Sequence, residues 1–209
     1  MPRDPLIDQS QAARLAFFEQ KRDLFQELVA HGQSPKSLLI TCSDSRIVDA
    51  GLMGTQPGEV FVVRTVGAVV PPYGTGQRAV GAALEFALAK LAVRHVIVCG
   101  HTDCGAVQAL DVSLDQQMTP NLATWLEILR PAKTSVDARH SFDDPYLRHV
   151  AIVEQGVLMQ LRNLETYPLV QRALEQQTVQ LHGWVYSLET GRLSYYDADV
   201  GQFVPEDAG

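Results

Sequence analysis

The sequence predicts an α/β fold with a central, mostly parallel β-sheet, about four parallel strands plus a C-terminal edge strand, flanked by helices. Three observations support this fold class. Short apolar strands alternate with helical patterns over the first half of the chain. The segment "VRHVIVC" at 93–99 is nearly continuous in apolar residues, as in strands covered on both faces. The segment "VQLHGWVYSLETGRLSYYD" at 179–197 has the pattern of a hairpin with "ETG" as its turn, which would close one edge of the sheet.

The first half of the chain predicts two helices and three strands. Residues 10–31 have the apolar spacing of an amphipathic helix, and this apolar stripe needs another surface to cover it. The stripe is formed by Phe17, Phe18, Leu24, Phe25, Leu28 and Val29. "SLLIT" at 37–41 and "EVFVVRTV" at 59–66 predict buried strands. The small and apolar residues of 76–92 predict a helix packed closely on the sheet, and 93–99 is the third strand.

The second half predicts more helices before the final hairpin. Residues 111–145 are polar and interrupted by three prolines, which predicts loops around one helix near 121–130. Two further helices are expected at 146–164 and 167–178. We find no linker or internal repeat, so the sequence predicts a single domain over residues 1–209.

Composition excludes several classes of partner. The formal net charge is −7 with no run of Lys or Arg, so we expect neither nucleic acid nor an anionic membrane as a partner. No stretch approaches the roughly 18 apolar residues of a membrane span. The charged N-terminus does not resemble a signal peptide, so a cytoplasmic location is expected. Three cysteines are too few, and odd in number, for a disulfide framework.

Metal-type side chains follow two of the predicted strands. "LLITCSDSR" at 38–46 places Cys42, Asp44 and Arg46 at the end of the first strand. "VIVCGHTDCG" at 96–105 places His101 and Cys104 after the third. If the two strands are neighbours in a parallel sheet, both turns lie at its carboxyl edge. Two thiolates and an imidazole form a zinc donor set that leaves a fourth position open.

At these residues the chain resembles the β-class carbonic anhydrases, and in particular their plant-type members. "CSDSR" and "GHTDCG" are similar to the two zinc motifs of that family, in the same order and with similar spacing. The likeness continues through four further segments and covers residues 32–107 closely: "GQSPK" at 32–36, "QPGEVFVVR" at 56–64, "PPY" at 71–73 and "ALEFAL" at 83–88.

The resemblance implies a metal site and a reaction. One Zn²⁺ per chain would be held by Cys42, His101 and Cys104. Asp44 would either pair with Arg46 and accept a hydrogen bond from zinc-bound hydroxide, or take the fourth zinc position itself. The implied reaction is the reversible hydration of CO2 to bicarbonate and a proton, by attack of zinc-bound hydroxide. The family also implies a homo-oligomer built from dimers, with the N-terminal helix packing on a partner subunit.

The resemblance also implies the substrate pocket. Gln33 would bind substrate through its amide at a subunit interface, and Phe61, Val66 and Phe86 would form the apolar wall of the CO2 pocket. The backbone N–H of Gly105 would add a donor at the same place. The chain departs from the family pattern at Thr65, Ala68 and Ala106, where two asparagines and a glycine are common.

Two other functions use the same residues. Relatives within this fold hydrolyse COS or CS2 on a similar zinc site, and a narrow apolar pocket would serve either linear substrate. A non-catalytic module that binds zinc or bicarbonate is the alternative from another class. Such a module would more naturally close its zinc with a fourth Cys or His, and it would leave the Asp44 and Arg46 pair unexplained.

The donor set predicts how activity depends on pH. Zinc held by three neutral imidazoles keeps its full charge and lowers the pKa of its water to about 7. Two thiolates cancel that charge, so the water should ionise less readily here. We expect the rate of CO2 hydration to rise between about pH 6.5 and pH 9, and a flat stopped-flow profile over that range would contradict this.

Overall fold

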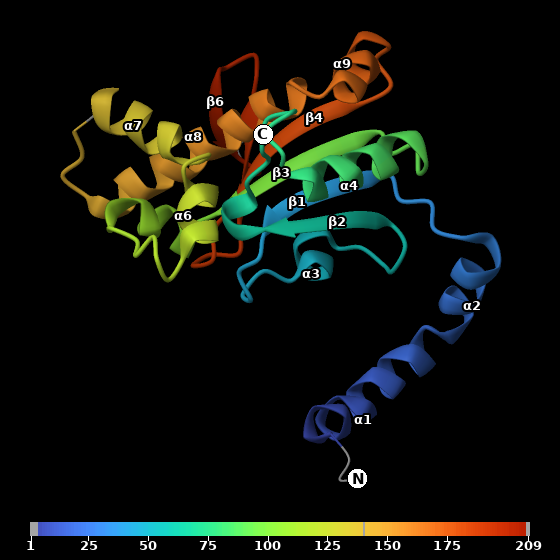
Figure 1. The fold of residues 1–209 in the computed structure, drawn as a ribbon. Helices are drawn as coiled ribbons and strands as arrows, with labels where there is room; N and C mark the ends of the chain where they lie inside the picture. The colour runs from blue at the N-terminus through green and yellow to red at the C-terminus, as the bar shows by residue number, and fades with distance from the viewer. Residues whose placement is uncertain (1–3, 140, 208–209) are drawn as a thin grey trace.

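The computed structural model describes residues 4–139 and 141–207. In this part of the chain, six strands form one sheet in the order β2-β1-β3-β4-β5-β6 (Figure 1). The strands are β1 (Ser37–Cys42), β2 (Val60–Thr65), β3 (His95–His101), β4 (Gln180–Tyr186), β5 (Leu193–Asp197) and β6 (Gln202–Pro205). β2, β1, β3 and β4 are parallel, and β5 and β6 add antiparallel pairs at one edge. The predicted fold class is confirmed, with one more edge strand than the sequence predicted.

Helices connect and cover the strands. They are α1 (Pro5–Gln20), α2 (Arg22–His31), α3 (Asp49–Met53), α4 (Arg78–Ala89), α5 (Gly105–Gln108), α6 (Pro120–Leu126), α7 (Arg130–Arg139), α8 (Pro145–Glu165) and α9 (Pro168–Glu175). Two short 3-10 helices are η1 (Val66–Ala68) and η2 (Ala109–Asp111). Figure 1 shows α4 on one side of the sheet and α3 on the other.

Two helical predictions need correction. The helix predicted at 10–31 is two helices, because Lys21 has φ −127° and ψ 22° and interrupts the helical backbone between them. The region 111–145 holds a second helix, α7, where the sequence predicted loops around one helix. Pro131 is the second residue of α7. A proline is tolerated there because the first turn of a helix needs no N–H donor.

The core lies mainly on one face of the sheet. Leu38 and Ile40 of β1 point to that face and pack with buried residues of α4, α8 and α9. The alternate residue Leu39 points to the opposite face, where it packs with Ile97 and Cys99 of β3 and is covered in part by α3. Both faces of the central strands are therefore buried, as their continuous apolar runs indicate.

α8 approaches the carboxyl end of β3 very closely. A Cβ built on Gly100 would lie 2.8 Å from Val153 Cγ1 and 2.9 Å from Val157 Cγ2, both on α8. Asp144 caps α8 by accepting a hydrogen bond from the Tyr146 N–H at 2.8 Å, so the start of the helix is fixed. This packing places α8 directly beside the turn that carries His101 and Cys104.

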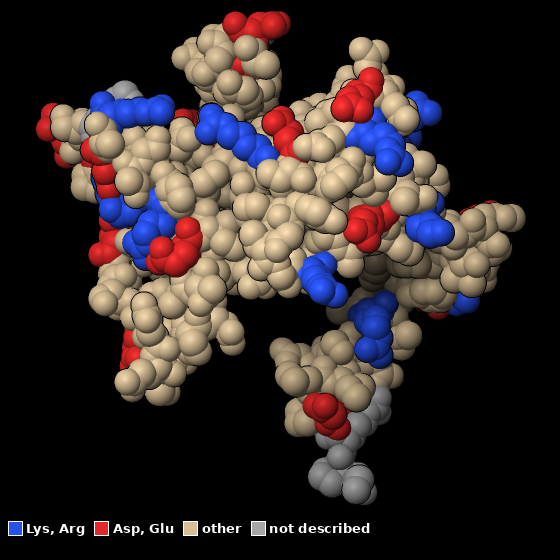
Figure 2. All heavy atoms as spheres, turned by 45° about the horizontal axis from the view of Figure 1, so that its top comes forward, with Lys and Arg blue, Asp and Glu red and all other residues tan. Residues whose placement is uncertain are grey.

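The two N-terminal helices project from the body of the chain (Figures 1 and 2). Neither α1 nor α2 contains a buried residue. Apolar side chains of α1 are exposed, including Leu15 at 49% and Phe17 at 48%. We refer to residues 5–31 as the N-terminal arm. Leu28 of α2 lies against Gly58, but the exposed apolar side chains of α1 are left uncovered by the described residues of the chain.

The charged side chains on the face shown in Figure 2 form several small groups in which blue and red lie close together, with uncharged areas between the groups. This agrees with the mixed composition of the sequence, which has 17 Lys and Arg against 24 Asp and Glu. Within the described residues, no helix combines the length and the hydrophobicity needed to cross a membrane.

Candidate metal centre

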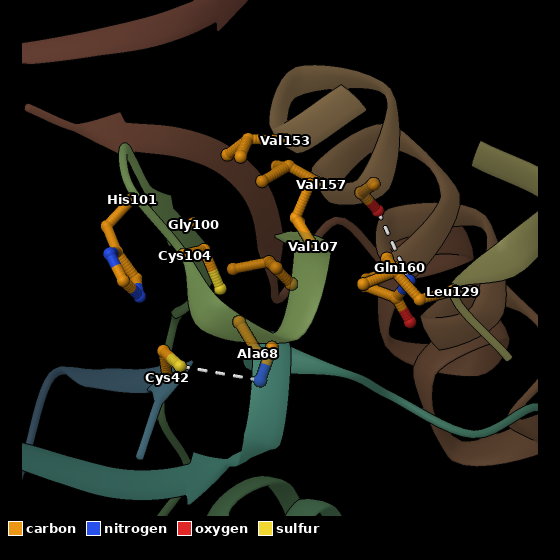
Figure 3. A pocket seen from close by; sticks show the side chains of 13 residues that line it. Cys42, Ala68, Gly100, His101, Cys104, Val107, Leu129, Val153, Val157 and Gln160 are labelled. Atoms are coloured by element: carbon orange, nitrogen blue, oxygen red, sulfur yellow. Dashed lines mark hydrogen bonds between the residues drawn. The ribbon is translucent and has the colours of Figure 1, made fainter. Parts of the chain in front are cut away.

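The topology brings the two predicted ligand turns together. β1 and β3 are adjacent and parallel, with Thr41 paired to Cys99, so Cys42 and His101 lie together at the carboxyl ends of these two strands. The two sulfurs and a ring nitrogen from Cys42, His101 and Cys104 all lie within 4.8 Å of one another. Figure 3 shows these side chains facing one common space. No other such group of three or more Cys, His, Asp or Glu occurs among the described residues.

His101 is oriented as a metal ligand. Its Nδ1–H donates to the carbonyl of Thr102 at 2.8 Å, which leaves Nε2 with a free lone pair. The residue is 1% exposed, and Nε2 has no hydrogen-bond partner in the part of the chain that the structure describes. A buried polar atom without a partner is costly, and a cation would satisfy it. The buried and unpaired Nε2 therefore indicates that this site fits a metal ion.

The two thiols interact with each other. The Cys104 thiol donates to the Cys42 sulfur, which lowers the pKa of Cys42 and raises that of Cys104. The backbone N–H of Gly67 also donates to the Cys42 sulfur, at 3.4 Å. A thiolate at Cys42 is therefore favoured before any cation is present. Two sulfurs and one imidazole nitrogen suit zinc better than magnesium or calcium, which prefer oxygen ligands.

Asp44 lies beside this group with both carboxylate oxygens occupied by Arg46. Oδ1 accepts from the backbone N–H of Arg46 at 3.0 Å and from its Nε at 2.9 Å, and Oδ2 accepts from Nη2 at 2.7 Å. These hydrogen bonds hold the pKa of the Asp44 carboxyl well below its usual range. Asp44 Oδ2 is 3.9 Å from His101 Nε2, so an ionised carboxylate stands next to the metal group.

Arg64 fastens the turn after β1, a role that the sequence did not indicate. Its Nε donates to the carbonyl of Cys42 at 3.1 Å, and its Nη2 donates to the carbonyls of Asp44 at 2.9 Å and Ile47 at 2.8 Å. A single arginine in the strand pattern "VFVVRT" gives no signal of such contacts. The pattern shows only that this residue departs from an apolar run.

The turn after β3 is held by residues far away in the sequence. The hydroxyl of Thr102 donates to Glu189 Oε2 at 2.6 Å, and the N–H of Thr102 donates to the carbonyl of Tyr186 at 3.0 Å. The N–H of Cys104 donates to His149 Nε2 at 3.1 Å, and burial lowers the pKa of this histidine, which favours the neutral acceptor. These partners lie 45 to 87 residues apart along the chain, so no local motif could identify them.

Comparison with known proteins identifies the family. The family profile described as "Carbonic anhydrase" matches residues 37–193, which include every member of the metal group. A carbonic anhydrase of Pseudomonas aeruginosa is 41% identical over 184 residues, covering 88% of this chain and 83% of that protein. The chain belongs to the β-carbonic anhydrase family. A carbonic anhydrase of Synechocystis is 38% identical over 201 residues, covering 95% of this chain and 73% of that protein.

Solved β-carbonic anhydrases share the fold. The β-carbonic anhydrase CcaA superposes with a TM-score of 0.89 at 36% identity, covering 96% of this chain and 98% of that one. One of two tetrameric β-carbonic anhydrases from Sordaria macrospora gives a TM-score of 0.79 at 28% identity, covering 95% of this chain and 96% of that one. β-Carbonic anhydrases use zinc and hydrate CO2, and the group formed by Cys42, His101 and Cys104 fits that metal.

A small cavity adjoins the metal group of this β-carbonic anhydrase, under α8. Apart from the metal group it is lined mainly by small or apolar residues: Gly67, Ala68, Val98, Gly100, Val107, Leu129, Val153, Gly156, Val157 and Gln160 (Figure 3). The residues that the family resemblance assigns to the substrate pocket do not line it. Within one chain, the space beside the metal group is lined by residues of β1, β3, η1, α5 and α8, together with Leu129.

The predicted substrate residues lie elsewhere on this chain. The rings of Phe61 and Phe86 pack together with centroids 5.7 Å apart. Phe86 is 45% exposed, Val66 is 40% exposed and Gln33 is also exposed. Gly105 is the first residue of α5 and directly follows Cys104. The structure thus places Gly105 next to the metal group, and it pairs the exposed Phe86 with Phe61, which is partly buried against the core.

The departures from the family pattern adjoin the site. Ala68 is 2% exposed, lines the cavity and has a positive φ of 53°, a conformation that asparagine adopts more readily than alanine. Ala106 packs against Gly67, where an added Cβ would lie 3.0 Å from Ala106 Cβ. Gly67 also has a φ of 73°, so both its conformation and its neighbour require glycine.

Proposed function

We propose that this chain catalyses the reversible hydration of CO2 to bicarbonate and a proton on one zinc ion held by Cys42, His101 and Cys104. The observation that carries the proposal is the buried His101: its Nε2 has no hydrogen-bond partner among the described residues, and one of its ring nitrogens lies within 4.8 Å of two cysteine sulfurs. The ionised Asp44, 3.9 Å from that nitrogen, supports a reaction at the site in addition to metal binding. Three protein ligands leave one zinc position for a reacting molecule.

Asp44, Arg46 and Arg64 have separate roles in the proposed reaction. When bound, zinc lowers the pKa of a water molecule and so makes a nucleophile available at moderate pH. With zinc bound, Asp44 would accept a hydrogen bond from that nucleophile and so direct its lone pair toward CO2. Arg46 keeps Asp44 ionised and oriented through three hydrogen bonds. Arg64 fixes the turn that carries both Cys42 and Asp44 through its three bonds to backbone carbonyls.

The substrate-binding roles of Gln33, Phe61, Val66 and Phe86 belong to the same proposal. These side chains do not line the cavity beside the metal group in one chain, and three of them are exposed. We therefore place them at an interface, where a second copy of the chain brings an apolar wall and an amide donor to the site. Gly105 supplies a backbone N–H from the chain that holds the metal.

We also propose that the chain forms homodimers or multiples of dimers through the N-terminal arm. The arm has no buried residue and exposes several apolar side chains. An exposed apolar helix pair of this kind is stabilised by covering it. The relatives from Sordaria macrospora are tetrameric, which agrees with an assembly larger than one chain.

Charged substitutions in the N-terminal arm are expected to change the oligomeric state. Replacing Leu15 and Phe17 together by glutamate keeps helix-forming residues but puts charge on the exposed apolar surface. We expect the mass measured by light scattering after gel filtration to fall to that of a monomer. Gln20→Glu adds one charge at an exposed position of the same helix and should leave the mass unchanged. A double variant that keeps the mass of the unmutated protein would contradict the arm as the interface.

The function is tested by stopped-flow CO2 hydration on protein whose zinc content has been measured. We expect the rate of CO2 hydration to increase in proportion to the amount of bound zinc. If fully zinc-loaded protein fails to hydrate CO2 but hydrolyses COS or CS2, the sulfur substrates replace CO2 in the proposal. If zinc is bound and none of the three substrates reacts, the chain is a binding module. The single domain over 1–209 and the cytoplasmic location expected from the sequence stay predictions.

A further inference from the structure

Arg46 contacts a second acidic residue in addition to Asp44. Its Nη1 donates to Asp103 Oδ2 at 2.5 Å, and its Nη2 donates to the Asp103 carbonyl at 3.0 Å. Asp103 lies between His101 and Cys104, in the other ligand turn. The guanidinium therefore bridges the turn after β1 and the turn after β3, next to the metal group.

Asp103 is itself held in place. Its other carboxylate oxygen, Oδ1, accepts from Gln108 Nε2 at 2.6 Å. Its backbone has a φ of 54°, in the left-handed region that aspartate, asparagine and glycine adopt more readily than other residues. Both carboxylate oxygens of Asp103 therefore accept hydrogen bonds, and an aspartate suits the backbone conformation at this position.

We propose that Asp103 is a positioning residue that clamps Arg46, and that through Arg46 it keeps the Asp44 carboxylate off the open position of the metal. The inference rests on the zinc site and on the role of Asp44 proposed above. Asp103 touches neither the metal group nor the substrate in this scheme. It acts only through the guanidinium.

The geometry shows why such a clamp is needed. Asp44 and Arg46 are two residues apart in one turn, so their pairing alone does not fix either of them relative to His101. The Arg46 side chain is 48% exposed and that of Asp44 17%, so water competes mainly for the guanidinium, and the further contacts of Arg46 with the carboxylate and carbonyl of Asp103 help to hold it. Asp103 ties the guanidinium to the turn that carries His101 and Cys104. Without that tie, the carboxylate 3.9 Å from His101 Nε2 is free to reach a bound cation.

The test measures how well an external ligand reaches the metal. Asp103→Asn and Asp103→Gly remove the charge but suit the left-handed backbone. In the cobalt(II)-loaded full-length chain, azide binding is followed through the visible spectrum of the metal at one fixed pH. We expect both variants to bind azide about fivefold more weakly, equivalent to about 1 kcal/mol, because Asp44 now competes for the open position. Metal content should stay at that of the unmutated chain.

Two controls separate this role from a general loss of structure. Asp137→Asn removes a carboxylate that is also paired with an arginine, Arg148 at 2.7 Å, but does not touch Arg46, and it should leave azide binding unchanged. In an Arg46→Ala background, Asp103→Asn should have less than about a twofold effect, because the residue through which it acts is gone.

The proposal is overturned if both Asp103 variants bind azide within twofold of the unmutated protein, or bind it more tightly. It is also overturned if Asp103→Asn weakens azide binding equally in the Arg46→Ala background. The readout does not depend on turnover, so a chain that binds cobalt but fails to hydrate CO2 would refute the proposed function and still test this inference.

Discussion

Replacing Cys42 by alanine is expected to abolish zinc binding and CO2 hydration together. The sulfur of Cys42 belongs to the group of three donors that lie within 4.8 Å of one another. Removing it leaves two protein ligands, too few for the three-ligand sites of catalytic zinc enzymes. We expect zinc, measured by atomic spectroscopy, to fall to a small fraction of one per chain. The hydration rate should fall at least about 1000-fold, equivalent to about 4 kcal/mol.

Cys99→Ala is the matched control for this variant. Cys99 is another buried cysteine on the neighbouring strand, but it packs with Leu39 and Ile97 on the opposite side of the sheet. Burial raises the pKa of its thiol to about 12, and the thiol lies on the face of the sheet away from the metal group. We expect Cys99→Ala to keep its zinc and to lose about 1 kcal/mol of unfolding free energy from the lost sulfur contacts. Full zinc in Cys42→Ala, or zinc loss in Cys99→Ala, would contradict the assignment of the ligands.

The sheet was predictable because its central strands have strong local signals. β1 and β3 are continuous apolar runs, and these runs end where the ligands begin. The elements that were missed have weak or misleading signals. Pro131 suggested a loop, although it occupies the first turn of α7, and β6 is only four residues long and ends in Pro205. At the end of an edge strand a missing N–H removes no bond from the rest of the sheet, so proline is tolerated there.

The metal group was predictable for a topological reason, whereas the contacts around it were not. Parallel neighbouring strands bring Cys42 and His101 to one edge whatever the details of packing. The contacts of Arg64, Asp103 and His149 depend on the exact conformation of the turns and on α8, which no local pattern encodes. The positive φ of Asp103, for example, is visible only in the folded chain.

Replacing Asp44 by asparagine is expected to lower the activity strongly while leaving the zinc in place. The carboxylate lies beside the metal group but is not one of its three members, so metal content should not change. The amide cannot accept hydrogen bonds at both ends, and its NH2 group would face an Arg46 donor that now bonds to a carboxylate oxygen. We expect kcat/KM for CO2 hydration to fall at least about 100-fold, since a misplaced or neutralised acceptor typically costs that much.

The control for Asp44→Asn distinguishes the loss of this acceptor from the loss of an ion pair. Asp137 accepts from Arg148 Nε at 2.7 Å and Nη2 at 2.9 Å, a two-point contact similar to that between Asp44 and Arg46. It lies outside the metal group, so Asp137→Asn should change stability slightly and kcat/KM by less than about twofold. Two results together would remove Asp44 from the reaction: kcat/KM within threefold of normal in Asp44→Asn, and zinc at one per chain. The pair with Arg46 would then serve only to stabilise the turn after β1.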